Sequence, residues 1–344
     1  MKTVSLDLHG DATQVTLVEE TGEVLFEMKV PTEREALRAV VGGIPGPKRV
    51  VYEEGPLSGL IHDALKDLCE EIISCDPSHN ALIALAEDAS DERDARRLAQ
   101  LAQLNAVRRV YVAPEPYRSL RSLLVHDHGL QRSITGVKNR IKGLCRRQGI
   151  CRRGKAIYWR GQRAKVLEGL PNGALRWQME SLYRELDALR RERVGAHRVL
   201  GQITRGMPVI RRLQTIPGVG PITARTLVGW IVDPARFRSR NALHSYVGLG
   251  LGQGFTNWKP VGPARASKRG NREVKRVLFL AAGAARRSDS ALARRYEARL
   301  RAGWPVSKAL RDLARSLVEI AGCLWRKNRE YDDARVAVPS DAPG

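Results

Sequence analysis

The spacing of the hydrophobic residues changes along the chain, and this change limits what the chain can fold into. Near the start they alternate with polar residues, as at Val4, Leu6 and Leu8, which is the period of a strand with one buried face. From Leu130 to Leu144, and again from Leu175 to Leu189, the spacing is 4-3-4-3, the period of helices that pack along one seam. A region with strands is therefore followed by long helices.

The front region has the pattern of an α/β sheet. Turn residues separate three short alternating segments, which predicts a three-stranded meander up to Met28. Helices and strands then alternate. The expected elements are a helix opened by Pro31, a buried strand over Arg49–Glu53, a helix over Pro56–Glu70, a strand over Ile72–Cys75 and a helix over Ser90–Leu104.

The charge is divided as unevenly as the hydrophobic pattern. The 344 residues include 59 Lys+Arg and 37 Asp+Glu, a net charge of +22 that argues against a protein handling only neutral metabolites and indicates a polyanionic partner. Residues 1–105 hold ten basic and twenty acidic side chains, whereas the remainder holds 49 and 17. An acidic region that works on a polyanion needs its carboxylates neutralised, and divalent metal is the simplest way.

The two heptad-like segments predict an antiparallel coiled-coil arm, with packing on a globular core as the alternative for each helix. Between them, Lys138–Lys165 contains eleven basic residues, no acidic one, and Tyr158 beside Trp159. Basic residues contact phosphates and aromatic rings stack on bases, so we expect nucleic acid here. The candidate contacts are Arg146, Arg147, Arg152, Arg153 and Lys155.

A glycine-containing turn follows the arm. The segment Leu213–Ala224 fits a helix-hairpin-helix, in which Gly218 and Gly220 let backbone N–H groups approach a phosphate, although such glycines also serve packing alone. Three further helices are expected over Gly270–Arg287, Ser290–Ala302 and Val306–Lys327. The tail from Tyr331 is expected to be disordered.

Four acidic residues in the front region form a candidate metal site. Asp7 lies in the first strand, Glu53 ends the fourth with Glu54 as its competitor, and Asp91 and Asp94 are three residues apart on a helix. Such carboxylates could hold two Mg²⁺ (or Mn²⁺) ions about 4 Å apart, the arrangement used for phosphodiester cleavage. The alternative is a set of surface acids, with Asp94 paired to Arg93 or Arg96.

Taken together, these motifs resemble a known family. The order Asp7, VVYE ending at Glu53, and SDERDARRLA from Ser90 is similar to the RuvC-like DEDD transposases of insertion sequences, the bridge-RNA-guided recombinases. Later segments resemble their C-terminal domain, namely IPGVGPITAR, DPARF, YVGLGLGQGFTNWKPVG and SKRG. The resemblance implies an α/β RuvC-like (RNase H-like) nuclease fold, an inserted helical arm and a guide RNA.

One departure from the family concerns its nucleophilic serine. Thr256 holds that place, a secondary alcohol with a stiffer side chain, and Ser245 and Ser267 are the substitutes. The lysine that precedes the helix aspartates in the family is replaced by Ser90. With the acidic tetrad present and the serine missing, the chain is more similar to the TasR-type nucleases of TIGR-Tas systems. These nucleases resemble the same transposases and carry a C-terminal domain similar to the Nop domain.

The resemblance makes an RNA-guided DNA endonuclease the leading hypothesis. Asp7, Glu53, Asp91 and Asp94 would bind two metal ions for hydrolysis by water, and basic residues would bind guide RNA and target double-stranded DNA. The alternative is a bridge-RNA-guided DNA recombinase in which Thr256 attacks DNA. A non-catalytic RNA-binding scaffold and a junction resolvase without RNA are further alternatives. The remaining nucleic-acid candidates are Lys259, Lys268, Arg269 and Arg272.

These expectations define four regions: a RuvC-like domain over 1–112, a coiled-coil arm over 113–205, a helical Nop-like or helix-hairpin-helix domain over 206–330, and a tail over 331–344.

We expect a homodimer, because two strands must be cut and coiled coils pair. Five cysteines without a C-x-x-C pair argue against a disulfide framework and a structural zinc site. With no signal peptide or membrane-length apolar run, the expected location is the prokaryotic cytoplasm or nucleoid.

Overall fold

The computed structural model describes residues 1–77, 91–150, 154–171, 173–256, 259–266 and 269–337, without the side chains of residues 91–92, 253–256 and 259–266. The chain divides into two compact units, Met1–Pro114 and Glu115–Gly344. Each unit has its own core and is described by itself.

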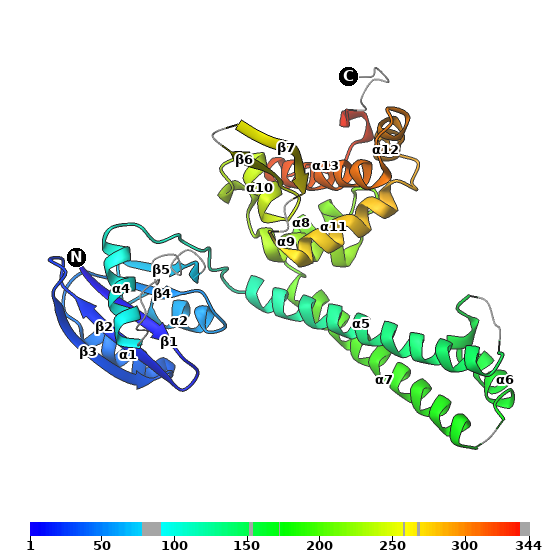
Figure 1. Ribbon diagram of the computed structural model, residues 1–344, viewed down its shortest axis with the longest axis horizontal. Coiled ribbons are helices and arrows are strands. Elements are labelled where there is room, and N and C mark those ends of the chain that lie inside the picture. Colours follow the sequence, from blue (N-terminus) through cyan, green and yellow to red (C-terminus); the bar gives the residue numbers. More distant parts are fainter. Residues whose placement is uncertain (78–90, 151–153, 172, 257–258, 267–268, 338–344) are drawn as a thin grey trace. The chain divides into compact units, whose positions relative to one another are not determined.

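The first unit is built on a five-stranded mixed sheet (Figure 1). Its strands are β1 (Lys2–Leu8), β2 (Ala12–Val18), β3 (Val24–Pro31), β4 (Lys48–Glu53) and β5 (Glu71–Cys75). Their order in the sheet is β3-β2-β1-β4-β5. The pairs β1–β2 and β2–β3 are antiparallel, and the pairs β1–β4 and β4–β5 are parallel. The predicted meander and the two later strands are confirmed, and the mixed sheet is consistent with an RNase H-like domain.

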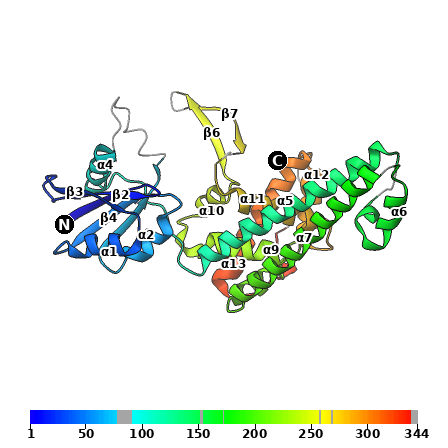
Figure 2. The same cartoon turned by 90° about the horizontal axis from the view of Figure 1, so that it is seen from below.

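Alternation along the central strands separates two faces of the sheet. Val4 and Leu6 on β1 pack with Tyr52 on β4 against the helices α1 (Arg34–Gly43) and α2 (Ser58–Leu65). On the opposite face lies α4 (Asp91–Gln103), as Figure 2 shows. The period-two pattern of the sequence thus places a hydrophobic layer under two helices and leaves the other face to α4.

The helix α2 is shorter than predicted. It ends at Leu65 instead of continuing to Glu70. The backbone N–H of Glu70 donates to the carbonyl of Lys48 at 3.0 Å, so the chain has already returned to the sheet at that residue. Strand pairing therefore overrides the helical pattern of the sequence.

Several hydrogen bonds hold α4 on the sheet. Ser5 Oγ donates to the carbonyl of Ala95 at 2.6 Å, and Arg49 Nη1 donates to that of Ala102 at 2.7 Å. Arg96 Nε donates to Glu27 Oε1 at 2.7 Å. Ser5, bonded to Ala95, lies nearer the carboxyl end of the strands than Arg49, bonded to Ala102. The helix α4 therefore runs antiparallel to β1, and its first turn lies toward the carboxyl end of these strands.

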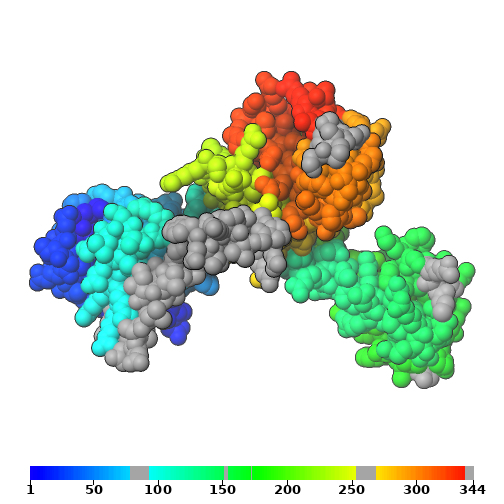
Figure 3. Space-filling model, turned by 45° about the horizontal axis from the view of Figure 1, so that its top comes forward, coloured from blue at the N-terminus to red at the C-terminus, as the bar shows by residue number. Residues whose placement is uncertain are grey.

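In the second unit, α5 (Tyr117–Arg147) and α7 (Gly173–Ile203) form an antiparallel helix pair, the arm (Figure 1). In the space-filling view the arm is the green lobe (Figure 3). Of the predicted hydrophobic positions, Ile134, Val137, Ile141 and Leu144 form one core with Met179, Leu182 and Leu186. Leu175 and Leu189 are partly buried against this core, and Leu130 is not part of it. Between the two helices come η1 (Ala156–Tyr158), η2 (Arg160–Gln162) and α6 (Arg163–Glu168). The helical spacing in the sequence therefore located the arm correctly.

The C-terminal part of this unit is mainly helical. The three helices predicted there appear as α11 (Arg272–Ala285), α12 (Ala291–Arg301) and α13 (Val306–Lys327). Before them lie α8 (Pro208–Leu213), α9 (Pro221–Ile231), η3 (Pro234–Arg236) and α10 (Arg240–Tyr246). Apolar residues from α8, α9, α11 and α13 form one core.

An antiparallel hairpin of β6 (Leu251–Thr256) and β7 (Lys259–Ala266) interrupts these helices, and the sequence analysis missed it. Its glycines and prolines hide the alternating pattern of a strand.

The chain just after the hairpin is packed tightly against α10. Gly270 has φ +102°, a Cβ there would lie 2.5 Å from the Ser245 carbonyl oxygen, and Asn271 N–H donates to the Tyr246 carbonyl at 2.7 Å.

The beginning of the tail is ordered, contrary to the predicted disorder from Tyr331. A short helix, η4 (Asp333–Arg335), packs beside α12. The carboxylate of Asp333 accepts hydrogen bonds from Ala291 N–H at 2.8 Å and from Tyr331 Oη at 2.7 Å. Asp333 thus binds an otherwise unpaired N–H at the start of α12, which ties the tail down.

Within the described residues, no helix combines the length and the apolarity that a bilayer crossing requires.

The first glycine of the predicted hairpin turn has a packing role. Gly218 has φ +84°, and a Cβ on it would lie 2.3 Å from the Ala281 carbonyl oxygen and 2.7 Å from Ala285 N on α11. A Cβ on Gly220 would meet nothing within 4 Å. Close contact with α11 therefore explains Gly218 without a phosphate.

We expect Gly218→Ala to lower the free energy of unfolding by about 3 kcal/mol, because α9 and α11 must separate and the backbone is strained. The matched variant Gly220→Ala, at the N-cap of α9, should cost about 1 kcal/mol or less. Urea unfolding of both variants measures the difference. Equal losses would contradict the packing role.

The ion pair between Glu27 and Arg96 should make the attachment of α4 depend on pH. The hydrogen bond from Arg96 is the main cause that lowers the pKa of Glu27 below its ordinary value of 4.5. The stabilisation is therefore complete above about pH 4.5 and is lost as the pH falls through the lowered pKa.

We expect Glu27→Gln to reduce stability by roughly 1 kcal/mol at pH 7 and by much less near pH 3. Unfolding curves of both proteins at pH 7, 5 and 3 provide the measurement. A deficit that is the same at all three values would show that the charge of Glu27 is not involved.

Candidate active site

Two of the predicted carboxylates lie at the ends of neighbouring parallel strands. The last residue pair between β1 and β4 is Leu6 with Tyr52, and Asp7 and Glu53 are the next residue of each strand. Adjacent strands are about 4.8 Å apart, so the two positions are neighbours. The carboxyl ends of parallel strands are the usual place for ligands in α/β sheets.

The register of the strands also distinguishes Glu53 from Glu54. Asp7 shares a face of the sheet with Ser5, and Glu53 shares the same face with Val51, which pairs with Ser5. Glu54 is one residue further and belongs to the opposite face. Its backbone N–H donates to the Cys75 carbonyl at 2.8 Å. The geometry therefore favours Glu53 as the partner of Asp7.

The start of α4 brings the third position to the same end of the sheet. Ala95 is fixed to Ser5, two residues before Asp7 on β1, and Asp91 begins the helix one turn before Ala95. The side chain of Asp91 lies outside the described residues. Asp94 is 49% exposed, and its Oδ1 lies 3.7 Å from Arg97 Nη1, so it has a surface ion pair, although with Arg97 and not with the expected Arg93 or Arg96.

Asp7 is partly buried and has a neighbour that the sequence analysis missed. Its side chain is 27% exposed, and its Oδ2 lies 3.0 Å from His9 Nε2. The sequence contained a signal for this contact, because Asp7 and His9 are two residues apart at the end of a strand and so project from the same face of the sheet. Among the side chains that are described, no three of the types His, Cys, Asp and Glu are grouped closely enough to hold a metal ion. Asp7 and Glu53 supply hard oxygen donors suited to Mg²⁺, and Asp91 is the residue placed to extend that set.

Thr256, the candidate nucleophile, is the last residue of β6 and pairs with Lys259 on β7. The side chains of both lie outside the described residues. Ser245 is exposed on α10, beside the base of the hairpin, where a Cβ on Gly250 would lie 2.9 Å from its Oγ. Ser267 lies outside the described residues.

The predicted nucleic-acid contacts occupy two places in the second unit. Arg146 and Arg147 are exposed in the last turn of α5, and Lys155 is exposed before η1. Arg269 and Arg272 are exposed around the start of α11. Arg152, Arg153 and Lys268 lie outside the described residues.

Both parts of the chain that carry candidate catalytic residues match known families. A family model described as a transposase, DEDD_Tnp_IS110, matches residues 4–147, which include all four candidate carboxylates. A second model, described as Transposase IS116/IS110/IS902 family, matches residues 210–297, which include the β6–β7 hairpin and Thr256.

A protein of Streptomyces coelicolor (strain ATCC BAA-471 / A3(2) / M145) is also similar. Named "Insertion element IS110 uncharacterized 43.6 kDa protein", it is 28% identical over 160 residues. The match covers 46% of this chain and 39% of that protein. The chain is therefore similar to IS110-family transposases over two separate segments, with the DEDD-type match first along the sequence.

Proposed function

We propose that the protein is a DNA recombinase of the IS110 transposase type. The observation that carries this proposal is the pair of transposase matches, one over the carboxylate-bearing sheet and one over the hairpin with Thr256. The recombinase therefore replaces the RNA-guided endonuclease as the leading hypothesis. The implied partners are a guide RNA, double-stranded DNA and a second copy of the chain.

In this proposal, Asp7, Glu53, Asp91 and Asp94 bind divalent metal at the carboxyl end of the sheet. The adjacent strand ends of Asp7 and Glu53, and the first turn of α4, support the assignment. The bound metal would supply charge stabilisation at the phosphate and lower the pKa of an attacking hydroxyl or water. Ser5 positions the helix by its bond to Ala95, and His9 can orient the Asp7 carboxylate.

Thr256 is the proposed nucleophile. Its hydroxyl oxygen forms a bond to a DNA phosphorus, the bond from that phosphorus to a deoxyribose oxygen breaks, and the hydroxyl proton ends on the released oxygen. Thr256 lies at the turn end of the hairpin, where it pairs with Lys259, whereas the contacts of Gly270 and Asn271 lie beyond the opposite end.

A guided hydrolytic nuclease is the second candidate, because threonine stands where the recombinases have serine. The two functions differ in their products. A recombinase leaves DNA covalently attached to protein, whereas hydrolysis by water leaves free ends.

We expect wild-type protein to form a covalent adduct with DNA in the presence of Mg²⁺. The substrate is a labelled duplex designed from the RNA that copurifies with the protein, and denaturing gels detect the adduct. Thr256→Ser should keep the adduct because it keeps a hydroxyl, and Thr256→Val, of similar shape, should lower its rate by roughly 10³-fold or more. Cut DNA with free ends in both wild type and Thr256→Val would identify the hydrolytic nuclease instead.

Divalent metal should stabilise the first unit through Asp7 and Glu53. With 5 mM Mn²⁺ we expect a rise in Tm of about 2–4 °C for each kcal/mol of binding free energy. Asp7→Asn and Glu53→Gln should abolish most of this rise. Glu54→Gln is the matched control, because it removes the same charge one residue away and should keep the rise. Loss of the rise in Glu54→Gln alone would reverse the assignment.

A further inference from the structure

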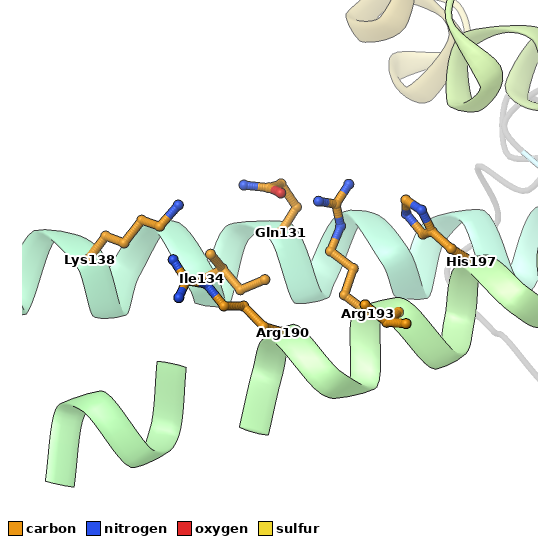
Figure 4. Close-up of a pocket in the computed structure, with 7 residues that line it drawn as sticks. Gln131, Ile134, Lys138, Arg190, Arg193 and His197 are labelled. Atoms are coloured by element: carbon orange, nitrogen blue, oxygen red, sulfur yellow. The ribbon is translucent and has the colours of Figure 1, made fainter. Parts of the chain in front are cut away.

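A basic pocket lies along the arm, and of the described residues in the basic segment Lys138–Lys165 only Lys138 lines it. Its volume is about 570 Å³, and both long helices line it (Figure 4). The lining residues are Gln131, Ile134 and Lys138 of α5 with Arg190, Arg193, Val194 and His197 of α7. In Figure 4 the polar ends of Lys138, Gln131, Arg193 and His197 lie on the same side of the helix pair.

One of these cations is held in place by a buried carboxylate. Asp127 is only 4% exposed, and its Oδ1 accepts from Arg193 Nε at 2.8 Å and lies 2.9 Å from His197 Nε2. Since the guanidinium uses Nε for this bond, both Nη groups of Arg193 stay available to a ligand. A buried acid thus fixes the direction of a cation in the pocket.

The other two cations lie close together. Lys138 Nζ lies 5.5 Å from the centre of the Tyr158 ring, and Arg190 Nη1 donates to the Tyr158 carbonyl at 3.4 Å, with Asp187 Oδ1 3.7 Å away. Burial first, and then the positive charges of Arg190, Lys155 and Arg193, lower the pKa of Lys138. Of the described residues that line the pocket, none is acidic. An anion in the pocket would relieve this repulsion.

The surroundings favour a polymer over a small anion. A second pocket of about 440 Å³ shares Arg190 and Val194 with the first. Its other lining residues are Arg160, Asp187, Arg191, Gly195 and Arg198. Val194 is 64% exposed and provides an apolar surface between the basic groups. The sugars and bases of a nucleic acid can pack against such a surface. A row of cations of this kind matches successive phosphates.

We infer that this face of the arm binds the phosphodiester backbone of a nucleic acid, with Lys138, Arg190 and Arg193 as phosphate contacts. The inference rests on the proposed function, which requires RNA and DNA, and adds phosphate contacts on α7 to Lys138 of the basic segment. The phosphates can come from RNA or from duplex DNA, and titration with each polymer distinguishes the two.

The test compares two double variants of the full chain. Lys138→Gln with Arg190→Gln removes two pocket cations and leaves the bond between Arg193 and Asp127 intact. The control, Arg132→Gln with Arg184→Gln, removes one exposed arginine from each of the same helices. Circular dichroism and Tm confirm that both are folded. Labelled 40-nucleotide RNA and a 40-base-pair DNA duplex are titrated in EDTA, so that catalysis plays no part.

We expect the pocket variant to lose affinity by about 10-fold or more at 0.1 M salt and to lower the salt-dependence slope by about two, one for each phosphate contact. The control should change affinity less than about 3-fold. The polymer with the larger loss is the ligand of the pocket. Equal losses in the two variants, or no loss in either, would overturn the inference while leaving the proposed function. Wild-type protein that binds neither polymer would overturn the proposed function itself.

Discussion

The parallel pairing of β1 with β4 is the contact on which the candidate active site depends. It sets Asp7 beside Glu53, although 45 residues separate them in the sequence. The same register directs one face of both strands to the hydrophobic core and the other to α4. The hydrogen bond from Ser5 to Ala95 then fixes where α4 begins. A shift of one residue in this pairing would move Glu53 to the other face and bring Glu54 in its place.

Much of the fold could be predicted because its signals are local. Alternation found the strands of the sheet, and the heptad-like spacing found both arm helices, most of whose hydrophobic positions are buried. The β6–β7 hairpin was missed because its strands are stabilised by partners at a distance, not by their own composition. The ordered beginning of the tail was missed for a similar reason, since its contact with α12 joins Asp333 to Ala291, which is distant in the sequence.

The candidate site was predictable in its residue types but not in its geometry. The sequence could not choose between Glu53 and Glu54, because the choice depends on strand register. It also gave Gly218 a phosphate-binding interpretation, whereas the approach of α11 accounts for that glycine. The basic pocket on the arm escaped notice because Lys138 and Arg190 are 52 residues apart and meet only when the helices pair.

Asp127 determines how the two helices of the arm align with each other. It is a buried charge in an otherwise apolar seam, satisfied only where Arg193 and His197 face it. Sliding one helix along the other by a single heptad would bury this carboxylate without its partners, at a cost of several kcal/mol. Asp127 thereby fixes the register of α5 against α7, so that the arm keeps one packing arrangement along its length.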